Sequence, residues 1–254
     1  MAVSFSQARQ EEIQARSPGM KSPLLVAFLL VSPLASLRAA DTPHQHVLRP
    51  NVLFIAVDDL RTSLGCYGDP LAKSPNIDSL ARSARLFQGA YTHQAVCGPA
   101  RTAMLTGRLP DNTRVWHNRN LFRNTLPDAV TLPQLFKNSG YQAISLGKVF
   151  SGDERELDPA SWTAPEVLRG EGPGWKNYAL ARGSGGKGTA CDAADVPDEG
   201  YPDGMLAQLA IDTLETLDQK QEPFFLAVGF FKPHLPFNAP KKYWDLYDPA
   251  AFSL

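Results

Sequence analysis

The segment around Cys97 combines residue types whose spacing could do chemistry on an anion. It reads AVCGPARTAMLTG over residues 95–107. Pro99 is best placed in the first turn of a helix, where its missing N–H costs nothing and its fixed φ suits the helix. Cys97 would then lie at the helix N-terminus, with Arg101 one turn further on. Free backbone N–H groups, the helix dipole and the guanidinium would together favour a tetrahedral oxyanion.

Two other interpretations compete for this cysteine. Cysteine is among the most buried residue types, so an isolated Cys is usually a small core residue. A thiolate phosphatase would instead attack phosphorus from a longer loop that is closed by an arginine and donates every N–H. Here Pro99 removes one donor, and only three residues separate Cys97 from Arg101. The sequence therefore argues against that loop.

The segment resembles the signature of the type I sulfatases, C-x-P-x-R followed by a short apolar run and Thr-Gly, at every fixed position. The resemblance implies that a separate formylglycine-generating maturation enzyme oxidises Cys97 to formylglycine, an aldehyde. One hydroxyl of the hydrated aldehyde attacks sulfur, and the other then expels sulfate. An ester formed on an ordinary hydroxyl would be hard to hydrolyse, whereas a hemiacetal-type ester can eliminate sulfate and regenerate the aldehyde.

Composition limits the class of protein. The chain has 254 residues, 43% of them hydrophobic, and a formal net charge of -1. It can therefore bury a sizeable core, and it has no basic excess that would favour nucleic acid. Its three cysteines do not make a disulfide framework, and we expect no disulfide between Cys66 and Cys191.

The N-terminal region resembles an export signal. Lys21 precedes an apolar run over residues 24–31, and small residues follow at 39–40. The run is too short to span a membrane and remain there, so we expect no stable membrane span. The sequence predicts a signal peptide region over residues 1–40, with Met20 as an alternative start. The protein would be secreted or periplasmic, or lysosomal in a eukaryote.

From residue 49 onward the chain alternates predicted strands and helices. Residues 52–57 form a continuous apolar run, which is typical of a strand buried on both faces. Further predicted elements are a helix opened by Ser74 and Pro75, a helix from a Thr131–Gln134 capping box to Gly140, a strand over 141–146, a helix over 205–217 and a strand over 224–230. The fold class is therefore α/β, with a mostly parallel sheet flanked by helices.

Ligands in open α/β sheets bind beyond the carboxyl ends of the strands, and Asp58 and Asp59 follow the first strand. Adjacent carboxylates repel each other unless a cation lies between them. Both can ligate only if the strand breaks there, because neighbouring strand residues face opposite ways. The alternative is a pair of solvated loop acids. The sulfatase resemblance implies a divalent metal, usually calcium, held by Asp58, Asp59 and the modified Cys97.

Basic residues follow the next two strands. A lysine such as Lys148 beside an anion site can neutralise a sulfate oxygen or help the leaving group, although most lysines lie at the surface. Two prolines restrict the backbone around His234, which suits a general acid or a sulfate ligand. We expect catalysis from Cys97, Arg101, Lys148 and His234, and substrate binding by Lys148, Lys232 and His234. Where the family has a histidine that steadies the nucleophile, this chain has Ser151, so that hydrogen bond falls to Ser151 or to a substitute.

Further motifs resemble the iduronate-2-sulfatase branch of the family: DDLR at 58–61, GCYGD at 65–69, PDNTR at 110–114, GKVF at 147–150 and PFFLAVG at 223–229. The resemblance covers about residues 50–250 and implies an alkaline-phosphatase-like fold. It also implies sulfate esters on sugars as substrates, such as glycosaminoglycan uronates or other sulfated polysaccharides. Sulfatases place further metal ligands in a later segment and add a C-terminal subdomain. We therefore expect residues 49–254 to be the N-terminal part of a catalytic domain, with a long insertion over about 151–203, and to be inactive alone.

Two alternatives to an exported sulfatase stay open at this point. A phosphate or phosphonate ester hydrolase on the same scaffold would also use an oxidised Cys97. A non-catalytic, carbohydrate-binding relative would instead keep Cys97 as a thiol.

Overall fold

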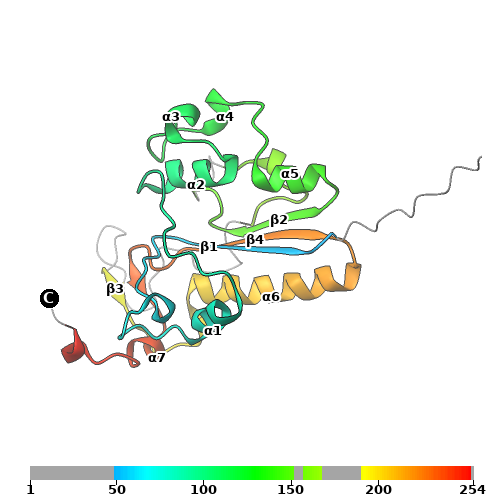
Figure 1. Ribbon diagram of the computed structural model, residues 1–254. Coiled ribbons are helices and arrows are strands. Elements are labelled where there is room, and N and C mark those ends of the chain that lie inside the picture. Colours follow the sequence, from blue (N-terminus) through cyan, green and yellow to red (C-terminus); the bar gives the residue numbers. More distant parts are fainter. Residues whose placement is uncertain (1–48, 152–156, 168–189, 253–254) are drawn as a thin grey trace, which may run out of the picture. The chain divides into compact units, whose positions relative to one another are not determined.

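A parallel three-stranded sheet in the order β1-β4-β2 is the central element of the computed structural model, which describes residues 49–151, 157–167 and 190–252 (Figure 1). The strands are β1 (Val52–Val57), β2 (Gln142–Gly147) and β4 (Phe224–Phe230). Both neighbours pair with β4 in parallel. The predicted α/β class with a parallel sheet and flanking helices is therefore confirmed.

The remaining elements connect these strands or follow them. The helices are α1 (Pro75–Ser83), α2 (Cys97–Thr106), α3 (Pro110–Thr113), α4 (Phe122–Thr125), α5 (Leu132–Asn138), α6 (Pro202–Lys220) and α7 (Lys241–Trp244). A second small sheet pairs β3 (Cys191–Asp192) with β5 (Phe237–Asn238), and short 3-10 turns occupy Gly65–Tyr67, Pro159–Ser161, Asp198–Gly200 and Pro249–Ala251. The capping box of Thr131 and Gln134 forms as predicted at the start of α5.

Helices cover both faces of the sheet, and each face has its own apolar core. Phe225 and Ala227 of β4 join the core under α2 and α5, whereas Leu226 and Val228 join the core over α6 (Figure 1). This division follows from the strand geometry, because successive side chains point to opposite faces. Each fully buried large apolar side chain stabilises the fold by roughly 1.5–3 kcal/mol, so β4 anchors both layers.

The strand β1 differs from the prediction that it is buried on both faces. Val52 and Phe54 pack against the core under α2 and α5. On the opposite face, however, Leu53 is 47% exposed and Ile55 is 54% exposed. The reason is that β1 lies at an edge of the described sheet, while α6 packs against β4 and β2. An apolar run predicts a strand but does not specify what covers each face.

The predicted insertion over 151–203 lies partly in the described residues. Residues 157–167 run beside β2, where the N–H of Gly147 donates to the carbonyl of Val167 (2.7 Å). Asp158 anchors this segment, because its buried carboxylate accepts two hydrogen bonds from the guanidinium of Arg123 (2.9 and 2.7 Å). The N–H of Asp158 donates to Glu166 (2.6 Å). Burial raises the pKa of Glu166 to about 7, despite the stabilising hydrogen bond from Asp158.

Close approach of two strand ends fixes the backbone of Lys148. Its N–H donates to the carbonyl of Gly229 (2.7 Å). A Cβ at position 229 would lie 1.9 Å from the Lys148 carbonyl oxygen, so only glycine fits there. Gly147 has φ +74, the left-handed region that glycine adopts without strain. These two glycines let β2 end directly against β4.

Two predictions concern residues that the structure does not describe. The signal peptide region (residues 1–40) and the alternative start at Met20 both lie outside the described residues.

The chain's three cysteines all lie in the described part, and none of them is in a disulfide there. No helix among the described residues is both long and apolar enough to cross a membrane.

Replacing Gly229 by alanine is expected to lower the free energy of unfolding by about 3 kcal/mol, because the new Cβ overlaps the Lys148 backbone. Urea unfolding followed by circular dichroism would measure the change. Gly89→Ala is the matched control, since the nearest atom to its Cβ is a Tyr91 ring carbon at 3.6 Å. Equal stabilities of the two variants would contradict the steric argument.

The raised pKa of Glu166 predicts that the stability of the fold depends on pH. Its pKa rises from 4.5 to about 7 in the folded protein, so its contribution to stability is complete below pH 4.5 and is lost as the pH rises to 7. After allowance for solvent screening the loss is about 1–2 kcal/mol. Glu166→Gln should therefore flatten the dependence of unfolding free energy on pH between 5 and 7.5, as measured by urea titrations. A variant with the same slope as the parent would refute this.

Candidate active site

Asp58 is the central side chain of the candidate site. It follows β1, its N–H donates to the carbonyl of Phe230 (3.1 Å), and it is only 4% exposed. Its carboxylate accepts a hydrogen bond from Arg101 Nη2 (3.0 Å) and pairs with the ammonium of Lys148. Burial alone would raise the pKa of this carboxyl, but the Lys148 hydrogen bond and the Arg101 charge outweigh burial and lower it. Asp58 is therefore ionised and paired.

Cys97 is the first residue of α2, which confirms the predicted helix start. Its Sγ lies 3.6 Å from Asp58 Oδ1 and 3.6 Å from Lys148 Nζ. Burial raises the pKa of the thiol, and the charges of Asp58 and Asp59 add to this, against the opposing charges of Lys148 and Arg101. The thiol consequently stays protonated and donates to Asp58. A protonated thiol is a weak nucleophile, in agreement with the argument against a thiolate phosphatase.

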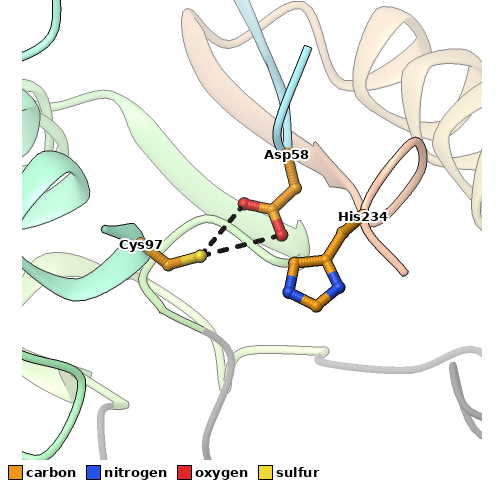
Figure 2. A group of neighbouring side chains, drawn as sticks. All are labelled: Asp58, Cys97 and His234. Atoms are coloured by element: carbon orange, nitrogen blue, oxygen red, sulfur yellow. Dashed lines mark hydrogen bonds between the residues drawn. The ribbon is translucent and has the colours of Figure 1, made fainter. Parts of the chain in front are cut away.

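His234 completes a three-residue group with Asp58 and Cys97. One ligand atom from each of these residues lies within 4.8 Å of the others. Figure 2 shows the thiol, the carboxylate and the imidazole converging from three separate segments of the chain. The backbone N–H of His234 donates to the carbonyl of Phe231 (3.0 Å). Carboxylate, thiol and imidazole are all metal ligands, so this group could hold a cation.

Asp59 lies next to the group but outside it. It is exposed, and its φ of +56 places it in the left-handed region. The strand therefore breaks after Val57, which is the condition under which both aspartates could face one ion. Its ligation of a metal remains a prediction.

Arg101 binds the protein around Cys97, and its predicted contact with an anion remains a prediction. The residue is 6% exposed, and Nη1 donates to the backbone carbonyls of Lys148 and Val149, the latter at 2.9 Å. Together with the contact to Asp58, these bonds tie α2 to the ends of β1 and β2. These guanidinium hydrogen bonds therefore stabilise the backbone and the carboxylate that surround the Cys97 side chain.

Asn118 is a contact that the sequence analysis missed. Its side-chain oxygen accepts a hydrogen bond from the N–H of Gly98 (2.7 Å), and the N–H of Ala100 donates to Val96 (3.0 Å). Because the N–H groups of Gly98 and Ala100 are already bonded within the protein, the first turn of α2 offers fewer free donors to an anion than we predicted from the helix start. No local pattern identifies Asn118, because this cap comes from a loop distant in sequence.

Lys232 and Ser151, the two remaining residues that the sequence singled out, lie in different parts of the structure. The ammonium of Lys232 donates to the carbonyls of His234 (3.0 Å) and Pro236 (2.7 Å). Burial lowers its pKa to about 8. Ser151 lines a cavity of about 130 Å³ together with Thr102 and Asn120. The predicted substrate contact of Lys232 and the substitute role of Ser151 both remain predictions.

Comparison with known proteins relates this geometry to a family. A family model described as Sulfatase matches residues 50–249. Human iduronate 2-sulfatase (Homo sapiens) is 44% identical over 206 residues, which cover 78% of this chain and 37% of that protein. Choline-sulfatase of Rhizobium meliloti (strain 1021) is 30% identical over 219 residues, or 79% of this chain and 41% of that protein.

A solved structure supports the fold independently. The phosphonate monoester hydrolase of Agrobacterium radiobacter superposes with a TM-score of 0.62 at 24% identity, covering 81% of this chain and 45% of that one. The chain thus spans less than half the length of these relatives. The match of the family model covers most of the chain and includes the Cys97 segment, both aspartates, Lys148 and His234. The chain belongs to the sulfatase family.

Proposed function

We propose that this chain is the nucleophile-bearing, N-terminal part of a sulfatase catalytic domain, and that the whole protein hydrolyses sulfate esters through a formylglycine made from Cys97. One observation carries the proposal. In a chain of the sulfatase family, the Cys97 Sγ lies 3.6 Å from both a buried carboxylate and a lysine ammonium. Formylglycine supplies a hydrated aldehyde as the nucleophile, which neither a thiol nor an ordinary hydroxyl replaces.

The side chains around position 97 can then be given roles. Lys148 places a buried ammonium beside the nucleophile, where it can neutralise a sulfate oxygen. His234 presents an imidazole whose ring nitrogen lies within 4.8 Å of both the Asp58 carboxylate and the Cys97 sulfur, where it can donate a proton to the leaving oxygen. Arg101 holds Asp58 and the backbone next to Lys148 in place, so its role is to orient the other two groups.

The donors of the site suit a divalent metal after modification better than before it. Asp58 offers a hard carboxylate, whereas a thiol and an imidazole suit softer metals. Conversion of Cys97 to a hydrated aldehyde would replace sulfur by oxygen, and Asp59 would add a second carboxylate. We therefore propose Ca2+ held by Asp58, Asp59 and the modified Cys97. The bound metal would supply positive charge that stabilises a negative oxygen.

Sulfated sugars are the proposed substrate class. The human relative that is 44% identical is named iduronate 2-sulfatase, which favours glycosaminoglycan-like polysaccharides over small sulfate esters such as that named for the Rhizobium relative. Export before action on such polymers would agree with the signal peptide predicted over residues 1–40. We propose a secreted or periplasmic protein, or a lysosomal one in a eukaryote, that meets its maturation enzyme before reaching that location.

The proposal predicts a change in mass and in activity at position 97. When the protein that carries this chain is produced together with a formylglycine-generating enzyme, intact-mass analysis should show an aldehyde in place of the Cys97 CH2–SH group. Cys97→Ala should reduce hydrolysis of an aryl sulfate at least about 1000-fold, because the nucleophile is lost. Cys66→Ala is the matched control and should keep the parent rate.

Two outcomes would contradict the proposal. An unaltered thiol at position 97 after coexpression would favour a non-catalytic relative. Parallel kinetics that show faster turnover of an aryl phosphate or phosphonate than of the aryl sulfate would favour the other hydrolase class, for which the Agrobacterium structure shows only a shared fold.

Removal of divalent metal is expected to abolish turnover of the matured protein. Dialysis against a chelator should reduce the rate to background, and Ca2+ should restore it more fully than Mg2+, because a flexible set of carboxylates tolerates the larger ion. Asp58→Asn should prevent this restoration. Full activity in the presence of chelator would argue against a metal at Asp58.

A further inference from the structure

Asp203 connects α6 to the segment that presents His234. The residue lies in the first turn of α6. One carboxylate oxygen accepts from the backbone N–H of Phe231 (3.0 Å) and the other from the backbone N–H of Lys232 (2.8 Å). Successive N–H groups of a strand point in opposite directions, so two consecutive donors to one carboxylate mark the point where the chain leaves β4. Asp203 therefore holds this exit.

A second set of hydrogen bonds continues from the exit to His234. The N–H of His234 donates to the carbonyl of Phe231 (3.0 Å). Its carbonyl accepts from the ammonium of Lys232 (3.0 Å), which also donates to Pro236 (2.7 Å). The backbone of His234 is thus held on both sides by residues whose own N–H groups bind Asp203.

The base of this arrangement is a well-packed helix. Leu206, Ala210 and Leu217 of α6 are buried in the core that also contains Leu226 and Val228 of β4. A carboxylate in the first turn is favoured by the helix dipole. Asp203 is therefore carried by a helix that is packed against β4. If its hydrogen bonds to residues 231 and 232 are lost, we expect the loop that follows β4 to move and α6 to stay in place.

We propose that Asp203 is a positioning residue, which sets the place of His234 relative to Asp58 and Cys97 through the backbone of residues 231–232. Lys232 contributes to the same positioning, because its ammonium binds the carbonyls of His234 and Pro236 in this loop. From the sequence, Asp203 had no expected role and Lys232 had only an expected substrate contact. The effect on catalysis depends on the proposed function, but the effect on the loop does not.

Asp203→Asn tests the inference, because the amide keeps one acceptor and turns an NH2 group toward a backbone donor. Asp212→Asn is the matched control: Asp212 is exposed on the same helix and accepts from Gln208 (2.8 Å). Hydrogen exchange followed by NMR should show the amides of Phe231, Lys232 and His234 exchanging about tenfold faster in Asp203→Asn and unchanged in the control. Parent-like exchange at these amides would overturn the proposal.

The link to His234 needs a readout that a general loss of stability would not move. Zn2+ titration of the unmodified protein probes the group formed by Asp58, Cys97 and His234. Asp203→Asn should weaken Zn2+ binding about tenfold, and it should have no further effect in a His234→Ala background, because the two changes act through one side chain. Equal weakening in both backgrounds would overturn the positioning role.

The outcomes separate this inference from the proposed function. If the parent protein binds no Zn2+, the metal site is called into question, while the exchange rates still decide the role of Asp203. If Asp203→Asn fails to fold, Lys232→Met provides a second test. It removes the ammonium hydrogen bonds to His234 and Pro236 and keeps an unbranched apolar side chain. That variant should accelerate exchange at His234 but not in β4, and unchanged exchange at His234 would overturn the inference.

Discussion

The buried carboxylate of Asp58, held between Arg101 and Lys148, is the interaction on which the candidate site depends. It joins the end of β1 to α2 and to the end of β2. Breaking a buried ion pair by removing one partner typically costs about 3–5 kcal/mol, because an uncompensated charge is left behind. The three groups therefore determine each other's positions, and the Cys97 side chain lies against the surface that they form.

The sheet makes this convergence possible. Since β1, β4 and β2 are parallel, their carboxyl ends meet at one edge. The central strand β4 is buried on both faces and supplies the segment that carries His234, while Gly229 admits the backbone of Lys148 at close range. Each reactive group is thus attached within a few residues of a rigid strand or helix end, which is how a fold maintains accurate geometry.

The sequence predicted what depends on local pattern. The strands at 52–57 and 224–230, the helix start at Cys97 and the capping box at Thr131 need only neighbouring residues to define them, and all are confirmed. The exposed face of β1 and the cap from Asn118 depend on which distant segments pack together, so periodicity contained no information about them. The contacts of Arg101 with Asp58 and with backbone carbonyls depend on the same distant packing, whereas its predicted contact with an anion remains a prediction.

The protonated state of the Cys97 thiol has a consequence for the newly made polypeptide. Thiols are attacked by oxidants and electrophiles chiefly as thiolates, and burial together with two neighbouring carboxylates raises the pKa of this one. The encoded thiol is therefore expected to react slowly with oxidants and electrophiles in the folded chain. The conversion proposed above would therefore need a dedicated catalyst, because adventitious oxidation of a protonated thiol is slow.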